Sequence, residues 1–132
     1  MINMCNAFAG FSTEENSLTG IPDVFLRELM PAIEDANLLK LCLYVLWKAN
    51  TVGDYQIAFT RDNLMLDRIL MNGLKGNEIE EATLVDDLLE KLARAKVLLR
   101  SDEESKTGYT YFINCAEGRA AVRRAARGVG LA

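Results

Sequence analysis

Four arginines near the C-terminal end of the chain have a spacing that could recognise a ligand: Arg119, Arg123, Arg124 and Arg127. Arg119, Arg123 and Arg127 follow one another at intervals of four residues, so a helix places them on one face. Several cations on one helical face could contact a few phosphates of a nucleic acid. Arginines near a helix C-terminus also favour the helix dipole and could pair with the acidic segment of residues 78–104. Both interpretations remain open on the sequence alone.

The chain lacks the residue types that most often carry catalysis. It contains no histidine, the commonest general base and metal ligand. Cys5, Cys42 and Cys115 are odd in number and far apart, a pattern typical neither of a zinc site nor of a disulfide framework. Asp86 and Glu90 would share a helix face, but no further ligands converge with them. We therefore expect a non-enzymatic protein without a cofactor or a bound metal.

The net charge of −4 is unevenly distributed along the chain. Residues 78–104 carry −5 and residues 105–132 carry +4, so only the C-terminal part should attract nucleic acid. The N-terminus lacks the basic and apolar regions of a secretory signal. The longest apolar stretch contains lysines and is too short for a membrane span. These features predict a cytoplasmic protein that does not enter the membrane.

The apolar stretch Leu38–Lys48 is the segment around which the expected fold is organised. Lys40, Tyr44 and Lys48 form its polar stripe, and they are spaced as one narrow face of a helix. Every other direction around that helix is apolar. The pattern therefore predicts a core helix that exposes this stripe and buries the remaining residues, including Leu43.

The segments on either side of the core helix carry alternating helical and strand-like patterns. Asp35 is suited to cap the core helix, and Gly53 breaks the chain after it. Thr60 and Asn114 are suited to begin later helices. The pattern predicts a short helix from Pro22, a strand over 55–60, helices over 60–71 and 78–96, strands over 97–100 and 109–113, and a last helix from Asn114.

This order predicts an α+β, mostly helical fold and, more narrowly, a winged helix. The helices over 60–71 and 78–96 would form the helix-turn-helix pair, and the hairpin over 97–114 would form the wing. The expected divisions are an N-terminal arm of residues 1–20, a winged-helix domain of residues 21–127 that includes an extra C-terminal helix, and a tail of residues 128–132.

The helix expected over residues 78–96 is acidic in its first half, where a recognition helix normally touches base edges. Like charge would oppose its insertion between phosphates. A solvated acidic face over an apolar core stripe is therefore the favoured interpretation, and any DNA binding should be weak, tolerant of sequence and sensitive to salt.

The N-terminal arm carries two phenylalanines, Phe8 and Phe11, on an otherwise polar stretch. Two large apolar side chains need a surface to bury them. That surface could belong to the same domain or to a second copy of the chain. We expect self-association, most simply as a two-fold homodimer in which each arm reaches its partner.

Five segments of the chain carry a family pattern: Phe8–Phe11, Ile21–Phe25, Tyr44–Trp47, Leu88–Leu99 and Asn114–Val122. Together they resemble the winged-helix region of the DnaD-like bacterial replication-initiation and primosome proteins. The resemblance implies a winged helix that self-associates and contacts replication proteins while replication machinery is loaded on DNA. Members commonly have a second, C-terminal DNA-binding domain, for which these 132 residues leave no room, so the expectation shifts toward protein contacts. The alternative is a winged-helix transcriptional regulator, which would need a basic recognition helix.

Overall fold

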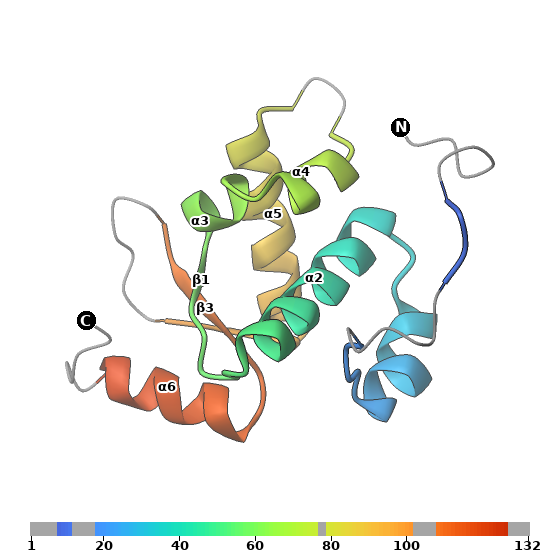
Figure 1. The fold of residues 1–132 in the computed structure, drawn as a ribbon. Helices are drawn as coiled ribbons and strands as arrows, with labels where there is room; N and C mark the ends of the chain where they lie inside the picture. The colour runs from blue at the N-terminus through green and yellow to red at the C-terminus, as the bar shows by residue number, and fades with distance from the viewer. Residues whose placement is uncertain (1–7, 12–17, 77–78, 102–107, 127–132) are drawn as a thin grey trace.

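A computed structural model describes residues 8–11, 18–76, 79–101 and 108–126 of the chain (Figure 1). The fold is α+β and mostly helical, as the sequence predicts, and the described residues form one three-stranded antiparallel sheet. In chain order the elements are the π-helix η1 (Phe25–Leu29), the 3₁₀-helix η2 (Met30–Ala32), α2 (Ala36–Val52), β1 (Phe59–Thr60), α3 (Arg61–Met65), α4 (Arg68–Gly73), α5 (Glu81–Arg94), β2 (Leu98–Arg100), β3 (Thr110–Ile113) and α6 (Ala116–Ala126).

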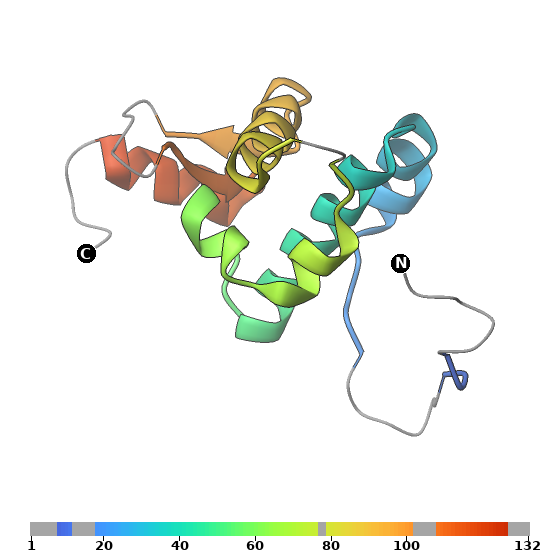
Figure 2. The same cartoon turned by 90° about the horizontal axis from the view of Figure 1, so that it is seen from above.

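Helix α2 is the predicted core helix, and both of its ends are capped as expected. The Asp35 carboxylate accepts a hydrogen bond from the Asn37 amide at 2.8 Å. Gly53 adopts a left-handed conformation with a φ of 78° and donates its amide to the Ala49 carbonyl. Figures 1 and 2 show α2 between the N-terminal helical segment on one side and α3, α4 and α5 on the other.

The predicted division of α2 into an exposed stripe and a buried remainder is wrong at two positions. Tyr44 is only 8% exposed, and its hydroxyl donates a hydrogen bond to Asp67 at 2.5 Å. Leu43, expected in the core, is 37% exposed. The reason is that α4 packs over the face that carries Tyr44, and a tyrosine can be buried when its hydroxyl has a polar partner.

The single helix predicted over residues 60–71 is two helices in the structure. The Thr60 hydroxyl caps α3 by accepting a hydrogen bond from the Asn63 amide at 3.2 Å, as predicted. The chain then bends, and the Asp67 carboxylate caps α4 through the Ile69 amide at 2.9 Å. Leu66 and Ile69 are both largely exposed at this bend.

The sheet has the strand order β1-β3-β2. The β2–β3 hairpin lies where it was predicted, with Leu99 opposite Phe112, while residues 102–107 lie outside the described residues. Strand β1 is shorter than the predicted strand over 55–60, and it pairs Phe59 with Tyr111 on β3. The central strand is therefore the last to appear in the sequence.

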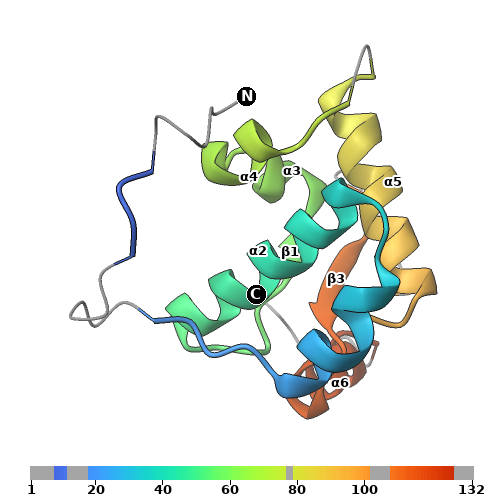
Figure 3. The ribbon, with the colours of Figure 1, turned by 90° about the vertical axis from the view of Figure 1, so that its right-hand side faces the viewer.

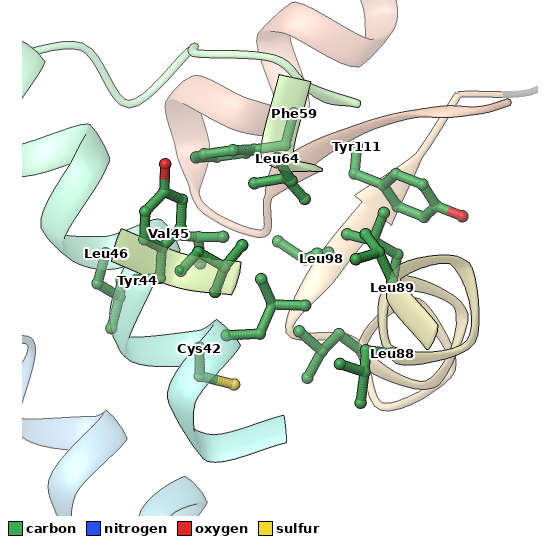
Figure 4. Packing of buried hydrophobic residues seen from close by; sticks show 14 of the residues in the cluster. Cys42, Tyr44, Val45, Leu46, Phe59, Leu64, Leu88, Leu89, Leu98 and Tyr111 are labelled. Atoms are coloured by element: carbon green, nitrogen blue, oxygen red, sulfur yellow. The ribbon is translucent and has the colours of Figure 1, made fainter. Parts of the chain in front are cut away.

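The hydrophobic core lies between α2, α5 and the sheet (Figure 4). Helix α5 contributes a buried stripe at the predicted spacing of three and four residues. The helix begins at Glu81, later than the predicted start at residue 78, and Ile79 before it is exposed. The stripe consists of Val85, Leu88, Leu89 and Leu92.

No helix within the described parts of the chain has the length and apolar character needed to cross a membrane.

Candidate nucleic-acid interface

Helix α6 carries the predicted arginines and is held against the sheet by a close backbone approach at Gly118. A β-carbon placed on Gly118 would lie 1.7 Å from the Ile113 carbonyl oxygen at the end of β3, so only glycine fits there. Figure 3 shows α6 beside the end of β3. The predicted cap at Asn114 is wrong, because the Cys115 sulfur accepts the Gly118 amide at 3.4 Å instead. The orientation of α6 is thus fixed at its first turn.

The predicted arginine stripe divides into two parts. Arg119 and Arg123 are exposed, and their positions are separated by about 40° around the helix. Arg124 is about 140° from Arg119; it is half-buried and its guanidinium donates a hydrogen bond to the Gln56 side chain. Arg127 lies outside the described residues. Two of the predicted cations are therefore available together on one face.

Asn114 joins Arg119 to the turn that follows α5. Its carboxamide oxygen accepts a hydrogen bond from the Arg119 guanidinium at 3.1 Å, and its amide nitrogen donates to the Lys96 carbonyl at 2.8 Å. Lys96 adopts the left-handed conformation with a φ of 66°, which turns the chain from α5 into β2. These two hydrogen bonds bring the beginning of α6 beside a second set of cations.

A surface groove of about 520 Å³, which we call the basic groove, lies between the end of α5, β2 and α6. Its cations are Arg94, Lys96 and Arg100, and its floor is apolar. Glu90 is the one acid among the described lining residues, and it lies 3.4 Å from the Arg94 guanidinium. The remaining lining residues are Ala93, Leu98, Leu99 and Val122.

Arg94, Lys96 and Arg100 were not among the binding residues predicted from the sequence. The structure places all three at one groove, with Arg119 linked to it through Asn114. No local sequence pattern could have shown this, because the groove depends on the contact of α6 with β2.

The first half of α5 has the opposite charge, as the sequence predicts. The Asp86 carboxylate forms an ion pair with the Arg61 guanidinium at 2.9 Å, and the Glu81 carboxylate lies 3.7 Å from the Arg68 guanidinium. Both acids pair with cations of the neighbouring helices α3 and α4. Among the described residues no acid pairs with the arginines of α6, so the predicted ion pairs between α6 and the acidic segment are not formed there.

The Tyr44 hydroxyl donates a short hydrogen bond to the Asp67 carboxylate. Burial raises the pKa of Tyr44, and the hydrogen bond to Asp67 raises it further. The same hydrogen bond is the main cause that lowers the pKa of Asp67, with smaller contributions from the Ile69 amide and from Lys48. Asp67 also caps α4, so this pair fastens α4 to α2. We assign it a structural role.

Phe8 and Phe11 contact each other edge to face, with ring centres 4.8 Å apart and planes inclined by 69°. They are 51% and 92% exposed, and Figure 2 draws residues 8–11 in dark blue away from the helices. The single chain therefore leaves both rings accessible, and their burial against a second copy remains a prediction.

No protein family, curated protein or solved structure matches this chain. Within the described residues, no three metal-ligating side chains lie close enough to hold an ion. The basic groove and the exposed arm are the two surfaces from which we infer a function.

Proposed function

We propose that this chain is a non-enzymatic winged-helix module of bacterial DNA-replication initiation, like the DnaD-like proteins that its sequence resembles. The observation that carries the proposal is the element order α2-β1-α3-α4-α5-β2-β3 combined with the strand order β1-β3-β2. In this interpretation α3, α4 and α5 correspond to the helix-turn-helix part and the β2–β3 hairpin to the wing.

The proposed DNA contact is made by the basic groove together with Arg119 and Arg123. Arg94, Lys96 and Arg100 line the groove, and Lys96, Arg119 and Arg123 have no acidic partner within the described residues. Phosphate contacts of this kind carry no sequence information. Binding should therefore be weak, tolerant of sequence and strongly dependent on salt.

The proposed self-association uses the arm. Burying one phenylalanine side chain contributes roughly 1.5–3 kcal/mol, and a two-fold dimer buries Phe8 and Phe11 of both copies. Their exposure in the single chain supports this part of the proposal.

A winged-helix transcriptional regulator is the second candidate, because the same element order serves both classes. The acidic first half of α5, where Asp86 and Glu81 already pair with Arg61 and Arg68, favours the replication module. A regulator would need cations on this part of the helix.

DNA binding is tested by fluorescence anisotropy with labelled oligonucleotides over a range of salt concentrations. We expect the Lys96→Gln/Arg119→Gln variant to bind more weakly and to lower the slope of log K against log salt by about two. The matched control is Arg27→Gln, an exposed cation on η1 that should leave the slope unchanged. The absence of binding at low salt would refute the DNA contact.

Self-association is tested by sedimentation velocity. The Phe8→Ala/Phe11→Ala variant should shift the protein toward monomer, whereas Leu18→Ala, at another exposed apolar residue, should not. Affinity capture from the native host, with mass-spectrometric identification, tests the replication role. Recovery of replication proteins supports it, and recovery of transcription machinery alone contradicts it.

A further inference from the structure

An apolar cavity of about 290 Å³, partly open to solvent, lies between η1 and α2. Phe25 and Leu29 of η1 form one wall, and Cys42 and Leu46 of α2 form another. The far end is closed by residues that follow β3, including Cys115. These residues lie outside the basic groove and the arm, whereas Lys96 lines both the cavity and the basic groove.

The volume of this cavity suits a small ligand. It is roughly twice that of an engineered apolar cavity of about 150 Å³ that binds benzene. It also approaches the lower limit of natural small-molecule sites, about 300 Å³.

The helix that covers the cavity is irregular at this position. Residues Phe25–Leu29 form a π-helix in which the Met30 amide bonds to the Phe25 carbonyl, and a 3₁₀-helix follows at once. Short π-helical segments are rare and occur frequently at functional sites. The irregularity places Phe25 and Leu29 on the wall of the cavity, and it is an observation independent of the volume.

The lining defines the chemistry of the occupant. Most of it is apolar, and burial raises the pKa of the Cys42 thiol to about 11, so this sulfur is uncharged at neutral pH. Lys96 is the one charged residue among those that line the cavity, and within the described structure it has no acidic partner. A hydrocarbon chain with one anionic group complements this arrangement.

We propose that the cavity binds a small amphipathic carboxylate whose hydrocarbon chain lies between Phe25, Leu29 and Leu46 and whose carboxylate pairs with Lys96. A chain of roughly eight carbons suits the volume. The proposal does not rest on a role in replication, but it shares Lys96 with the proposed DNA contact.

Octanoate, below its micellar concentration, is the probe, and the labelling rates of Cys42 and Cys115 by iodoacetamide, resolved by mass spectrometry, are the readout. Because both thiols line the cavity, we expect saturating octanoate to slow both rates. At one hundred times the Kd only about 1% of the molecules are unoccupied, so the rates can fall up to about 100-fold. Butyrate has the same charge but a short chain, and it should have little effect. Octanoate that slows labelling no more than butyrate does would overturn the proposal.

Two variants test the assigned contacts. Val24→Phe fills the edge of the cavity and should weaken octanoate binding, whereas Val52→Phe makes the same change at the exposed end of α2 and should not. Lys96→Gln should weaken octanoate binding while leaving binding of uncharged octanol unchanged. Equal octanoate affinity in the native protein and Val24→Phe would contradict the site.

Intermolecular NMR contacts provide a measurement that needs no variant. Octanoate protons should show nuclear Overhauser effects to the methyl groups of Leu29 and Leu46. Such effects only to exposed Leu66 would place the binding elsewhere and overturn the assignment.

Discussion

The hydrogen bond between Tyr44 and Asp67 predicts an energetic coupling between α2 and α4. The hydroxyl lies 2.5 Å from the carboxylate, the same carboxylate caps α4, and the Lys48 ammonium lies 3.8 Å away. Tyr44→Phe removes only the hydroxyl and keeps the ring, which packs in the core. The variant therefore isolates the hydrogen bond.

The size of the effect follows from the partner's charge and exposure. A hydrogen bond to a charged group contributes about 1.5–3 kcal/mol to stability. The Asp67 side chain is 20% exposed, so water can replace part of the lost interaction in the variant. We expect Tyr44→Phe to lower the free energy of unfolding by about 1.5 kcal/mol. Asp67→Asn retains a good helix cap, because asparagine and aspartate cap equally well, but it removes the charge.

Urea denaturation of the native protein, the two single variants and the double variant measures the coupling. We expect a coupling energy of about 1 kcal/mol, typical of residues in direct contact. Tyr109→Phe is the matched control, since no hydrogen bond to its hydroxyl is formed within the described residues, and it should change stability by less than about 0.5 kcal/mol. Additive effects of the two substitutions would refute the reasoning.

The same pair has a defined dependence on pH. The pKa of Asp67 is lowered in the folded protein, chiefly by Tyr44. The charged carboxylate therefore stabilises the fold above its unfolded pKa of about 3.9, and this stabilisation is lost as the pH falls through the lower, folded pKa. The stability difference between the native protein and Asp67→Asn should be present at neutral pH and shrink as the pH falls below about 4. Urea midpoints measured across this range test the sign, and a difference that grows in acid would contradict it.

Two further predictions concern packing. Leu46→Ala should lower the free energy of unfolding by about 2–5 kcal/mol, whereas Leu43→Ala, on the exposed side of the same helix, should cost less than about 1 kcal/mol; equal urea midpoints for the two would contradict the burial pattern. Gly118→Ala should cost about 4 kcal/mol or more, because its β-carbon would overlap the Ile113 carbonyl. Circular dichroism during thermal unfolding measures this loss, and a native-like midpoint would refute the close approach.

Local signals in the sequence predicted much of the fold. Asp35, Gly53 and Thr60 end or begin helices where their side chains or conformations require it. The hairpin strands and the buried stripe of α5 were also predicted, because their periodicity reflects a single buried face. In each case a few neighbouring residues determine the local structure.

The incorrect predictions concern features that depend on contacts between residues far apart in the sequence. Tyr44 was predicted to face solvent together with Lys40 and Lys48. It is buried because its hydroxyl bonds to Asp67, which is remote in sequence. The break between α3 and α4 depends on the same aspartate, which can cap a helix as well as continue one. The basic groove could not be predicted, because it forms only after α6 has packed on β2 and the Asn114 side chain has joined the Lys96 carbonyl to Arg119.

The strand order also determines when the fold can be completed during synthesis. Phe59 on β1 is paired with Tyr111 on β3, so β1 has no partner until the ribosome has made almost the whole domain. The chain between them forms α3, α4 and α5, whose local contacts can arise earlier and shorten the loop that must close. A nascent chain that stops before β3 should therefore hold helices whose apolar faces lack the sheet, and such surfaces attract chaperones or aggregate. We expect the protein to escape chaperone binding and aggregation only once its last strand, β3, has left the ribosome.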